Sequence, residues 1–346
     1  MEIYKKRCKV KAEQALYKVA KLMLWCTRPL RNPIAPDFFR INKNFKEYDL
    51  IQTHNEHSIS AIAAAYIKRK CNLPLVLTSH GQLKFGNLLA DNFEKIYNKN
   101  IGKLIFSISD YIIVLSESDR QYVSSFSIDL RKIAVIPNAI DNDELEHINT
   151  DKCNLDAFSL GRDYEQNPKV LFVGPIIKRK GVEHLIRAIP NVITDIKFRD
   201  ILFIFTGVGD YLDEAKLLAK RLGVQKNTLF TGYITLECLT MFYKISDLFV
   251  LPSFSEGLPT SILEAMFFGL PVIATDIPGV RDHFKDCALL IPPRDSASIS
   301  IAISNILNNK KLSNRLSVCG NKLVKSKYMW ESVADEYEKI YKNFGV

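Results

Sequence analysis

Short apolar strands alternate with helical stretches in two series, and this alternation limits the possible folds of this 346-residue chain most strongly. A polar, irregular stretch at 142–167 separates the two series. A strand that returns through a helix to its neighbour is typical of a parallel sheet. The predicted strands are 48–53, 75–79, 111–115 and 133–136, followed by 170–173, 201–206, 228–231, 248–251, 272–274 and 288–291.

The length exceeds that of one ordinary hydrophobic core and fits two domains. We therefore predict an α/β fold with two Rossmann-like, doubly wound domains that face each other across a cleft. Ligands of such sheets bind beyond the carboxyl ends of the strands. The predicted divisions are a basic helical segment at 1–47, a first domain at 48–160, a second domain at 161–328, and a C-terminal helix at 329–346.

The positive charge of the chain is concentrated at its start. The net charge is +9, and residues 1–47 contain twelve Lys or Arg against four acidic residues. Apolar residues between Ala12 and Cys26 follow helical spacing, with lysines toward the other side. Two interpretations stay open: a helix packed on the first domain with a solvated basic face, or peripheral contact with an anionic membrane through residues 1–30. No basic groove with interleaved aromatic residues suggests a nucleic-acid partner.

The seven cysteines are odd in number and form no Cys-x-x-Cys pair. They are interpreted as free thiols in a reducing cytoplasm, rather than as a disulfide or zinc framework. No apolar run approaches the roughly 20 residues of a membrane span. The predicted location is the cytoplasm, with association at the cytoplasmic face of a membrane as the alternative.

The segment 253–282 contains two carboxylates, one on each side of a predicted helix start. Glu256 opens the turn Glu256-Gly257-Leu258-Pro259, and Glu264 lies four residues after Thr260, on the same side of the helix. A helix N-terminus binds anions through its unpaired N–H groups and its dipole. A phosphate held there, with hydroxyl groups held by an acid on either side, has the layout of a nucleotide sugar.

Three more sequences follow strands of the second series. Gly174 begins a loop that ends at Lys180, Gly207 follows the strand at 201–206, and Gly232-Tyr233 follows the strand at 228–231. Each by itself also fits a solvated basic turn or an ordinary tight turn. Their joint position at successive strand ends of one sheet favours a common binding site.

Two histidines end strands of the first series. His54 and His80 are predicted to point into the cleft, although a lone histidine is more often structural. The spacing of His54, Glu56 and His57 matches no common metal site, so no metal is expected. The chain also has neither a phosphate-binding Gly-x-x-x-x-Gly-Lys-Ser/Thr loop nor a Gly-x-Ser-x-Gly nucleophile elbow.

With these motifs in place, the chain resembles the retaining glycosyltransferases of the GT-B fold, family 4. The paired glutamates Glu256 and Glu264 carry most of the resemblance, with the Gly-x-Pro-Val-Ile-Ala-Thr sequence that follows them in register. The supporting motifs are Thr78-Ser-His80-Gly81, Ser109-Asp-Tyr-Ile-Ile-Val-Leu-Ser116, Val135-Ile-Pro-Asn138-x-x-Asp141, Lys180-Gly181 and Trp330-Glu-Ser-Val-Ala.

The resemblance implies a role for each motif. Lys180 would hold the donor diphosphate, Glu264 the ribose hydroxyls, and Glu256 would lie beside the donor sugar. The backbone of Gly257, Leu258, Pro259 and Thr260 would meet the phosphate and hexose. The first domain would be the acceptor side, with His80 facing the reacting sugar, and the final helix would cross back onto it.

The chain departs from the family pattern at two places. Pro175 stands where the family usually has an arginine, so one of two diphosphate cations is missing unless Lys178 or Arg179 replaces it. The usual first strand and its glycine-rich loop are not recognisable, so the first domain is expected to be shortened at its N-terminus.

We therefore predict a metal-independent, retaining transfer of a hexose-type sugar without a cofactor. The donor would be a nucleotide-diphosphate sugar, most simply a UDP-sugar, and the acceptor a glycan or lipid-linked molecule of envelope polysaccharide or glycolipid synthesis. The shortened first domain and Pro175 motivate an alternative, a non-catalytic sugar-nucleotide-binding or partner subunit. A glycoside hydrolase with the two glutamates as acid and base is disfavoured, because hydrolysis needs no phosphate-binding helix or lysine.

Overall fold

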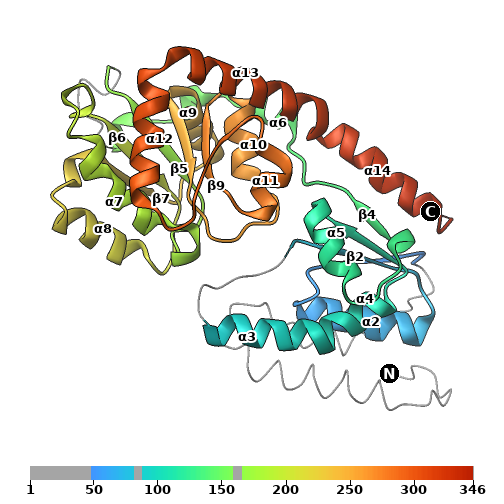
Figure 1. Ribbon diagram of the computed structural model, residues 1–346. Coiled ribbons are helices and arrows are strands. Elements are labelled where there is room, and N and C mark those ends of the chain that lie inside the picture. The colour runs from blue at the N-terminus through green and yellow to red at the C-terminus, as the bar shows by residue number, and fades with distance from the viewer. Residues whose placement is uncertain (1–47, 82–87, 159–165, 346) are drawn as a thin grey trace. The chain divides into compact units, whose positions relative to one another are not determined.

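The computed structural model describes residues 48–81, 88–158 and 166–345 (Figure 1). The described strands form two separate parallel sheets, one of four strands and one of six. The chain divides into two compact units, which are described separately below. Unit 1 contains residues 48–81, 88–136 and 335–345, and unit 2 contains residues 137–158 and 166–334.

Unit 1 is a four-stranded sheet with its strands in chain order, β1-β2-β3-β4. Strand β2 (Leu-Val-Leu-Thr-Ser) is buried along its whole length, as expected for a parallel strand that is covered on both faces. The elements are β1 (Ile51–His54), α2 (Ile59–Cys71), β2 (Leu75–Ser79), α3 (Leu88–Tyr97), the π-helical turn Asn98–Gly102, α4 (Lys103–Ile108), β3 (Tyr111–Val114), α5 (Glu117–Ser124) and β4 (Ile133–Val135).

Local chemistry fixes the ends of helix α2. The Ser58 side chain accepts a hydrogen bond from the backbone N–H of Ala61 at 3.0 Å, which caps the first turn. Asn72 ends the helix in the left-handed conformation at φ 55°, a role that asparagine tolerates well. The alanine- and isoleucine-rich face between these caps is buried against the sheet.

Unit 2 is a six-stranded sheet with the order β10-β9-β8-β5-β6-β7. Its elements are α6 (Asn142–Glu146), β5 (Lys169–Val173), the 3₁₀ turn Lys178–Lys180, α7 (Val182–Val192), β6 (Leu202–Thr206), α8 (Leu212–Arg221), β7 (Thr228–Gly232), α9 (Leu236–Ile245), β8 (Leu248–Leu251), α10 (Thr260–Phe267), β9 (Val272–Thr275), α11 (Pro278–Phe284), β10 (Leu289–Ile291), α12 (Ser296–Asn308), α13 (Lys310–Lys327) and the start of α14 (Trp330–Lys342).

The winding direction of the unit 2 sheet reverses between β5 and β8, which pair side by side. Strands β6 and β7 are added on one side of this pair, and β9 and β10 on the other. Helices α7, α8 and α12 pack together over the sheet (Figure 1). Helix α9 packs on α10 through Tyr243, whose ring stacks on Phe268 at 5.4 Å. The loops after β5 and β8 therefore meet at a topological switch point.

Most predicted strands agree with the structure to within one to three residues at each end. The doubly wound prediction is confirmed for unit 2. In unit 1 the described strands follow one another in chain order, so they wind in one direction only. Between β2 and β3, the π-helical turn separates α3 from α4, and α13 is a helix that the sequence pattern did not predict.

The interpretation of all cysteines as free thiols is wrong for four of them. Disulfides join Cys153 to Cys238 and Cys287 to Cys319, whereas Cys71 is a free thiol. The paired residues lie 85 and 32 positions apart, and folding brings their Cα atoms to 4.8 and 5.2 Å. Spacing along the chain gave no sign of this, because helix packing alone creates the proximity. The other two cysteines, Cys8 and Cys26, lie outside the described residues.

The final helix, α14, begins in unit 2 and ends in unit 1. At its end, the hydroxyl of Tyr341 donates a hydrogen bond to the Gln52 side chain of β1. Among the described helices, none has both the length and the apolar character that crossing a membrane would require. The basic segment predicted at 1–47 lies outside the described residues.

Candidate functional site

Lys180 and Glu256 come together at the switch point of the unit 2 sheet. The Lys180 ammonium donates to Oε1 of Glu256 at 2.6 Å, although the two residues lie 76 positions apart. Lys180 ends the loop after β5, and Glu256 belongs to the loop after β8. Both side chains are largely buried, with 11% and 9% of their surfaces exposed. A buried charge pair at strand ends is the kind of group that binding sites of α/β sheets present.

Two glycines shape the loop that carries Lys180. Gly174 leaves β5 with φ +149° and Gly181 starts α7 with φ +70°, conformations that residues with a side chain rarely adopt. A Cβ atom on Gly181 would lie 1.9 Å from the carbonyl oxygen of Pro252. The loop therefore packs directly on the end of β8, and this contact brings Lys180 to Glu256.

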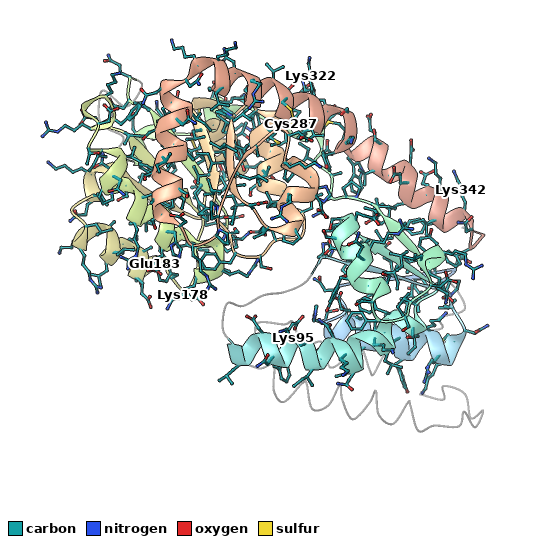
Figure 2. All side chains as sticks on the ribbon, viewed as in Figure 1. Lys95, Lys178, Glu183, Cys287, Lys322 and Lys342 are labelled. Carbon is teal, nitrogen blue, oxygen red and sulfur yellow. A yellow bond between two sulfur atoms is a disulfide. The ribbon has the colours of Figure 1, made fainter. Side chains whose placement is uncertain are left out.

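The other two cations of this loop, Arg179 and Lys178, have different partners. Arg179 donates to the carbonyl oxygen of Ser255 at 2.6 Å, and its guanidinium lies 3.9 Å from Oε2 of Glu256. Lys178 lies on the surface of unit 2 (Figure 2), where its ammonium is 3.7 Å from Glu214. Of the two predicted substitutes for the arginine absent at Pro175, Arg179 is the one next to the Lys180–Glu256 pair.

Glu264 lies in the second turn of α10 and contacts a residue that the sequence analysis missed. The Tyr243 hydroxyl on α9 donates to Oε2 of Glu264 at 2.7 Å. Burial, together with the Glu264 carboxylate, raises the pKa of Tyr243 well above its ordinary value, so the phenol stays protonated and keeps donating. No motif marks Tyr243 in the sequence, because only the packing of α9 on α10 gives it this role.

Helix α10 begins directly after the Gly257-Leu258-Pro259 turn. Pro259 occupies the cap position and contributes no side-chain hydrogen bond to this turn. Leu258 is buried, and its carbonyl oxygen accepts a hydrogen bond from the Asn138 amide at 2.9 Å. Thr260, the first helical residue, is exposed. The N-terminal end of α10 thus combines a fixed backbone with an exposed threonine.

The remaining predicted donor residues follow β6 and β7. Gly207 donates its backbone N–H to the Gly232 carbonyl oxygen at 3.0 Å, so these two strand ends are joined. A Cβ atom on Gly207 would lie 2.1 Å from the Gly174 carbonyl oxygen, which places all three predicted glycines along one edge of the sheet. The Tyr233 side chain is 86% exposed.

The two predicted histidines of unit 1 form a pair. Nδ1 of His54 lies 3.0 Å from Nε2 of His80, and the rings stack with centroids 5.3 Å apart. Burial lowers the pKa of both imidazoles, and the charge of His54 lowers that of His80 further. Near neutral pH the pair is therefore uncharged, with one ring donating the shared hydrogen bond.

A second polar group in unit 1 was not used by the sequence analysis. His57 forms an ion pair with Glu94 of α3, and its Nδ1 lies 3.7 Å from Oε1 of the fully buried Glu56. Asn98 donates to the same Glu94 oxygen at 3.0 Å. Burial raises the pKa of Glu56 despite the opposing charge of His57. These residues tie the loop after β1 to helix α3.

Metal ligation has no visible basis in the described parts of the chain. No group of three or more His, Cys, Asp or Glu side chains there is arranged to hold an ion. Metal independence itself remains a prediction.

The fold and the site define an α/β protein with cations and carboxylates gathered at the switch point of a parallel sheet. Residues 159–322 match the family described as glycosyl transferases group 1, and residues 7–144 match glycosyltransferase family 4. Together the two matches cover most of the chain and support a group 1 glycosyltransferase of the GT-B fold.

Individual relatives agree with this assignment. An uncharacterized glycosyltransferase of Methanocaldococcus jannaschii is 25% identical, over 88% of this chain and 77% of the relative. The Escherichia coli UDP-Gal:alpha-D-GlcNAc-diphosphoundecaprenol alpha-1,3-galactosyltransferase is 28% identical, over 81% and 71%. Sucrose-phosphate synthase from Thermosynechococcus elongatus shares the fold with a TM-score of 0.74 at 21% identity, over 99% of this chain and 82% of that one.

Proposed function

We propose that this protein transfers a hexose-type sugar, with retention of configuration, from a nucleotide-diphosphate donor. The observation that carries the proposal is the 2.6 Å pair between Lys180 and Glu256 at the N-terminal end of α10. Lys180 and the helix N-terminus favour a diphosphate, while Glu256 and Glu264 offer acceptors to sugar hydroxyls. A glycoside hydrolase would need neither the phosphate-binding lysine nor the helix N-terminus.

The chemical step builds negative charge on the leaving group. The bond between the sugar C1 atom and the diphosphate oxygen breaks, and the diphosphate gains negative charge. Lys180, Arg179 and the N–H groups at the start of α10 stabilise that charge without a metal ion. The acceptor hydroxyl attacks C1 on the face from which the diphosphate leaves, and its proton passes to the departing phosphate oxygen.

The contacts made by the two glutamates support different roles for them. Glu256 has two cations beside it, so donor binding would draw Lys180 toward the phosphates and free a carboxylate oxygen for the sugar. The Tyr243 hydroxyl orients Glu264 through a hydrogen bond. Because Glu264 lies further along the chain than Glu256, we assign it to the ribose end of the donor.

A UDP-sugar is the proposed donor, and a glycan or lipid-linked molecule of envelope polysaccharide or glycolipid synthesis is the proposed acceptor. The name of the Escherichia coli relative contains both a UDP-linked sugar and a lipid diphosphate acceptor. The paired histidines His54 and His80 are proposed to belong to the acceptor side. A location at the cytoplasmic face of a membrane fits these substrates, whereas the two disulfides of unit 2 are uncommon in a reducing compartment.

A panel of nucleotide sugars tests the proposal. We expect one class of nucleotide diphosphate sugar to raise the melting temperature, and the same donor to be consumed when glycan or lipid-linked acceptors are supplied. Stabilisation by no donor would overturn the proposal. Donor binding with neither transfer nor hydrolysis would favour the alternative, a non-catalytic sugar-nucleotide-binding or partner subunit. Pro175, which stands where the family usually has an arginine, motivates this alternative.

A further inference from the structure

Helix α3 of unit 1 exposes large apolar side chains along one stripe. Leu89, Phe93 and Ile96 are 81%, 65% and 63% exposed. Their spacing of four and three residues places them one above another on the same side of the helix. Contiguous apolar residues of this size on a protein surface mark an interaction site more often than scattered single residues do.

The opposite side of the same helix is polar and buried. Glu94 has only 12% of its side chain exposed and pairs with His57, and Asn98 is buried and donates to Glu94 at 3.0 Å. A surface helix normally turns its apolar stripe toward the core and its charged residues toward water. Helix α3 departs from this rule, because its apolar stripe is exposed while Glu94 pairs with His57 and Asn98 on the buried side. This pairing holds the apolar stripe outward.

The fully exposed charges beside the stripe are positive, whereas the acidic residues Asp91 and Glu94 of α3 are partly buried. Between residues 92 and 103, each exposed charged side chain is a lysine, namely Lys95, Lys99 and Lys103. Lys95 extends from α3 in Figure 2. Two copies of this surface would bring lysines against lysines, which disfavours self-association. Lysines beside Leu, Phe and Ile side chains instead suit a surface with an apolar interior and anionic groups at its boundary.

We propose that the α3 face, defined as Leu89, Phe93, Ile96, Lys95, Lys99 and Lys103, docks on an anionic lipid surface. The apolar side chains enter the boundary between headgroups and acyl chains, and the lysines pair with lipid phosphates. The docking is a property of unit 1 that needs no sugar transfer. It rests on the proposed function only in one respect: it would bring the acceptor side of the enzyme to a lipid-linked acceptor.

Vesicle flotation of the full chain tests the proposal. The vesicles contain phosphatidylcholine alone, or phosphatidylcholine with phosphatidylglycerol. One variant carries Phe93→Ser with Ile96→Ser, and a second carries Lys95→Gln with Lys99→Gln. Matched controls remove exposed apolar residues of unit 2, Ile301→Ser with Val318→Ser, and exposed lysines of α8, Lys216→Gln with Lys220→Gln.

The unaltered protein is expected to float with the anionic vesicles and to be released by salt. A lysine near an anionic surface contributes about 1 kcal/mol, so each lysine change should reduce partitioning roughly fivefold. The apolar double variant should lose at least as much, while both controls float like the unaltered protein. A donor-induced rise in melting temperature that is the same in all variants shows that unit 2 still binds its ligand.

Two results would overturn the proposal. Residues 1–47 are unchanged in every variant, so full vesicle binding by both α3 variants would place any membrane contact elsewhere in the chain. A dimer in light scattering that the Phe93→Ser, Ile96→Ser variant abolishes, without vesicle binding by the unaltered protein, would assign the α3 face to a second copy.

Discussion

The Lys180 ammonium lies 2.6 Å from Oε1 of Glu256, and this contact joins the two loops at the reversal point of the unit 2 sheet. The pair keeps both charges compensated in a largely buried place until a ligand arrives. A diphosphate would compete with Glu256 for the lysine. Ligand binding and rearrangement of the pair are therefore coupled, and the predictions for this site depend on that coupling.

The first prediction concerns the lysine itself. Lys180→Ala removes the charge that we propose to stabilise the leaving diphosphate, and it leaves Glu256 buried beside Arg179 alone. We expect kcat/KM to fall by a factor of 100 or more, or roughly 3 kcal/mol of transition-state stabilisation. Steady-state kinetics with the identified donor measure this loss. A folded Lys180→Ala variant with normal turnover would show that the assignment is wrong.

The second prediction separates the two cations before Lys180. Arg179→Ala should weaken donor binding and turnover by about tenfold, because the guanidinium faces the Glu256 carboxylate. Lys178→Ala is the matched control, since that ammonium is 73% exposed and contacts Glu214. Donor titration by calorimetry gives both affinities. Equal effects of the two substitutions would remove Arg179 from the site.

The third prediction concerns the phenol behind Glu264. Tyr243→Phe deletes a 2.7 Å hydrogen bond and should lower the free energy of unfolding by about 1–2 kcal/mol. It should also raise the donor KM several-fold with a smaller change in kcat, since Glu264 loses its orientation toward the ribose. Tyr328→Phe is the control, because its hydroxyl contacts His283 at 2.9 Å instead. A KM increase of the same size in the control would contradict the role of Tyr243.

The fourth prediction uses the tight packing of α11 on the Glu256 loop. A Cβ atom on Gly279 would lie 2.0 Å from the Gly257 carbonyl oxygen and 2.2 Å from that of Glu256. Gly279→Ala should displace this loop and reduce kcat/KM by about tenfold or more. Gly223→Ala has no neighbour within 4 Å, so its φ of +69° should cost stability alone. Unchanged kinetics in a folded Gly279→Ala variant would be inconsistent with this view of the loop.

The fifth prediction concerns pH and the buried group of unit 1. Burial lowers the pKa of His57, but the bond to Glu94 and the charge of Glu56 outweigh it, so the pKa is raised overall. Because the folded state keeps its proton longer, this stabilisation is present below the ordinary pKa of 6.5 and disappears as the pH rises through the raised value. The raised pKa of Glu56 acts in the same direction.

Urea unfolding of the unaltered protein and of His57→Gln checks this pH dependence. The difference in unfolding free energy between the two proteins should be largest at slightly acidic pH and shrink as the pH rises above neutrality. A difference that is constant with pH would mean that His57 contributes through packing rather than through its charge.

Local patterns were sufficient to predict most of the secondary structure. Continuous apolar runs such as the one in β6, followed by glycine, are typical of buried parallel strands, and the structure confirms them. The π-helical turn Asn98–Gly102 was not foreseen, because it depends on Asn98 reaching Glu94 and on the space that Gly102 leaves. The disulfides were missed for a similar reason, since each joins segments that only packing brings together.

The sequence by itself indicated the class of fold, the family resemblance and the residue types of the candidate site, because these depend on short-range spacing and on motif chemistry. The tertiary structure decided which residues act on one another. Strands β5 and β8 are neighbours because the winding of the sheet reverses between them, and this adjacency places Lys180 and Arg179 on Glu256. The packing of α9 on α10 likewise gives Glu264 its partner Tyr243. Sequence distance carries no information about such contacts, since burial of apolar faces selects which elements become neighbours.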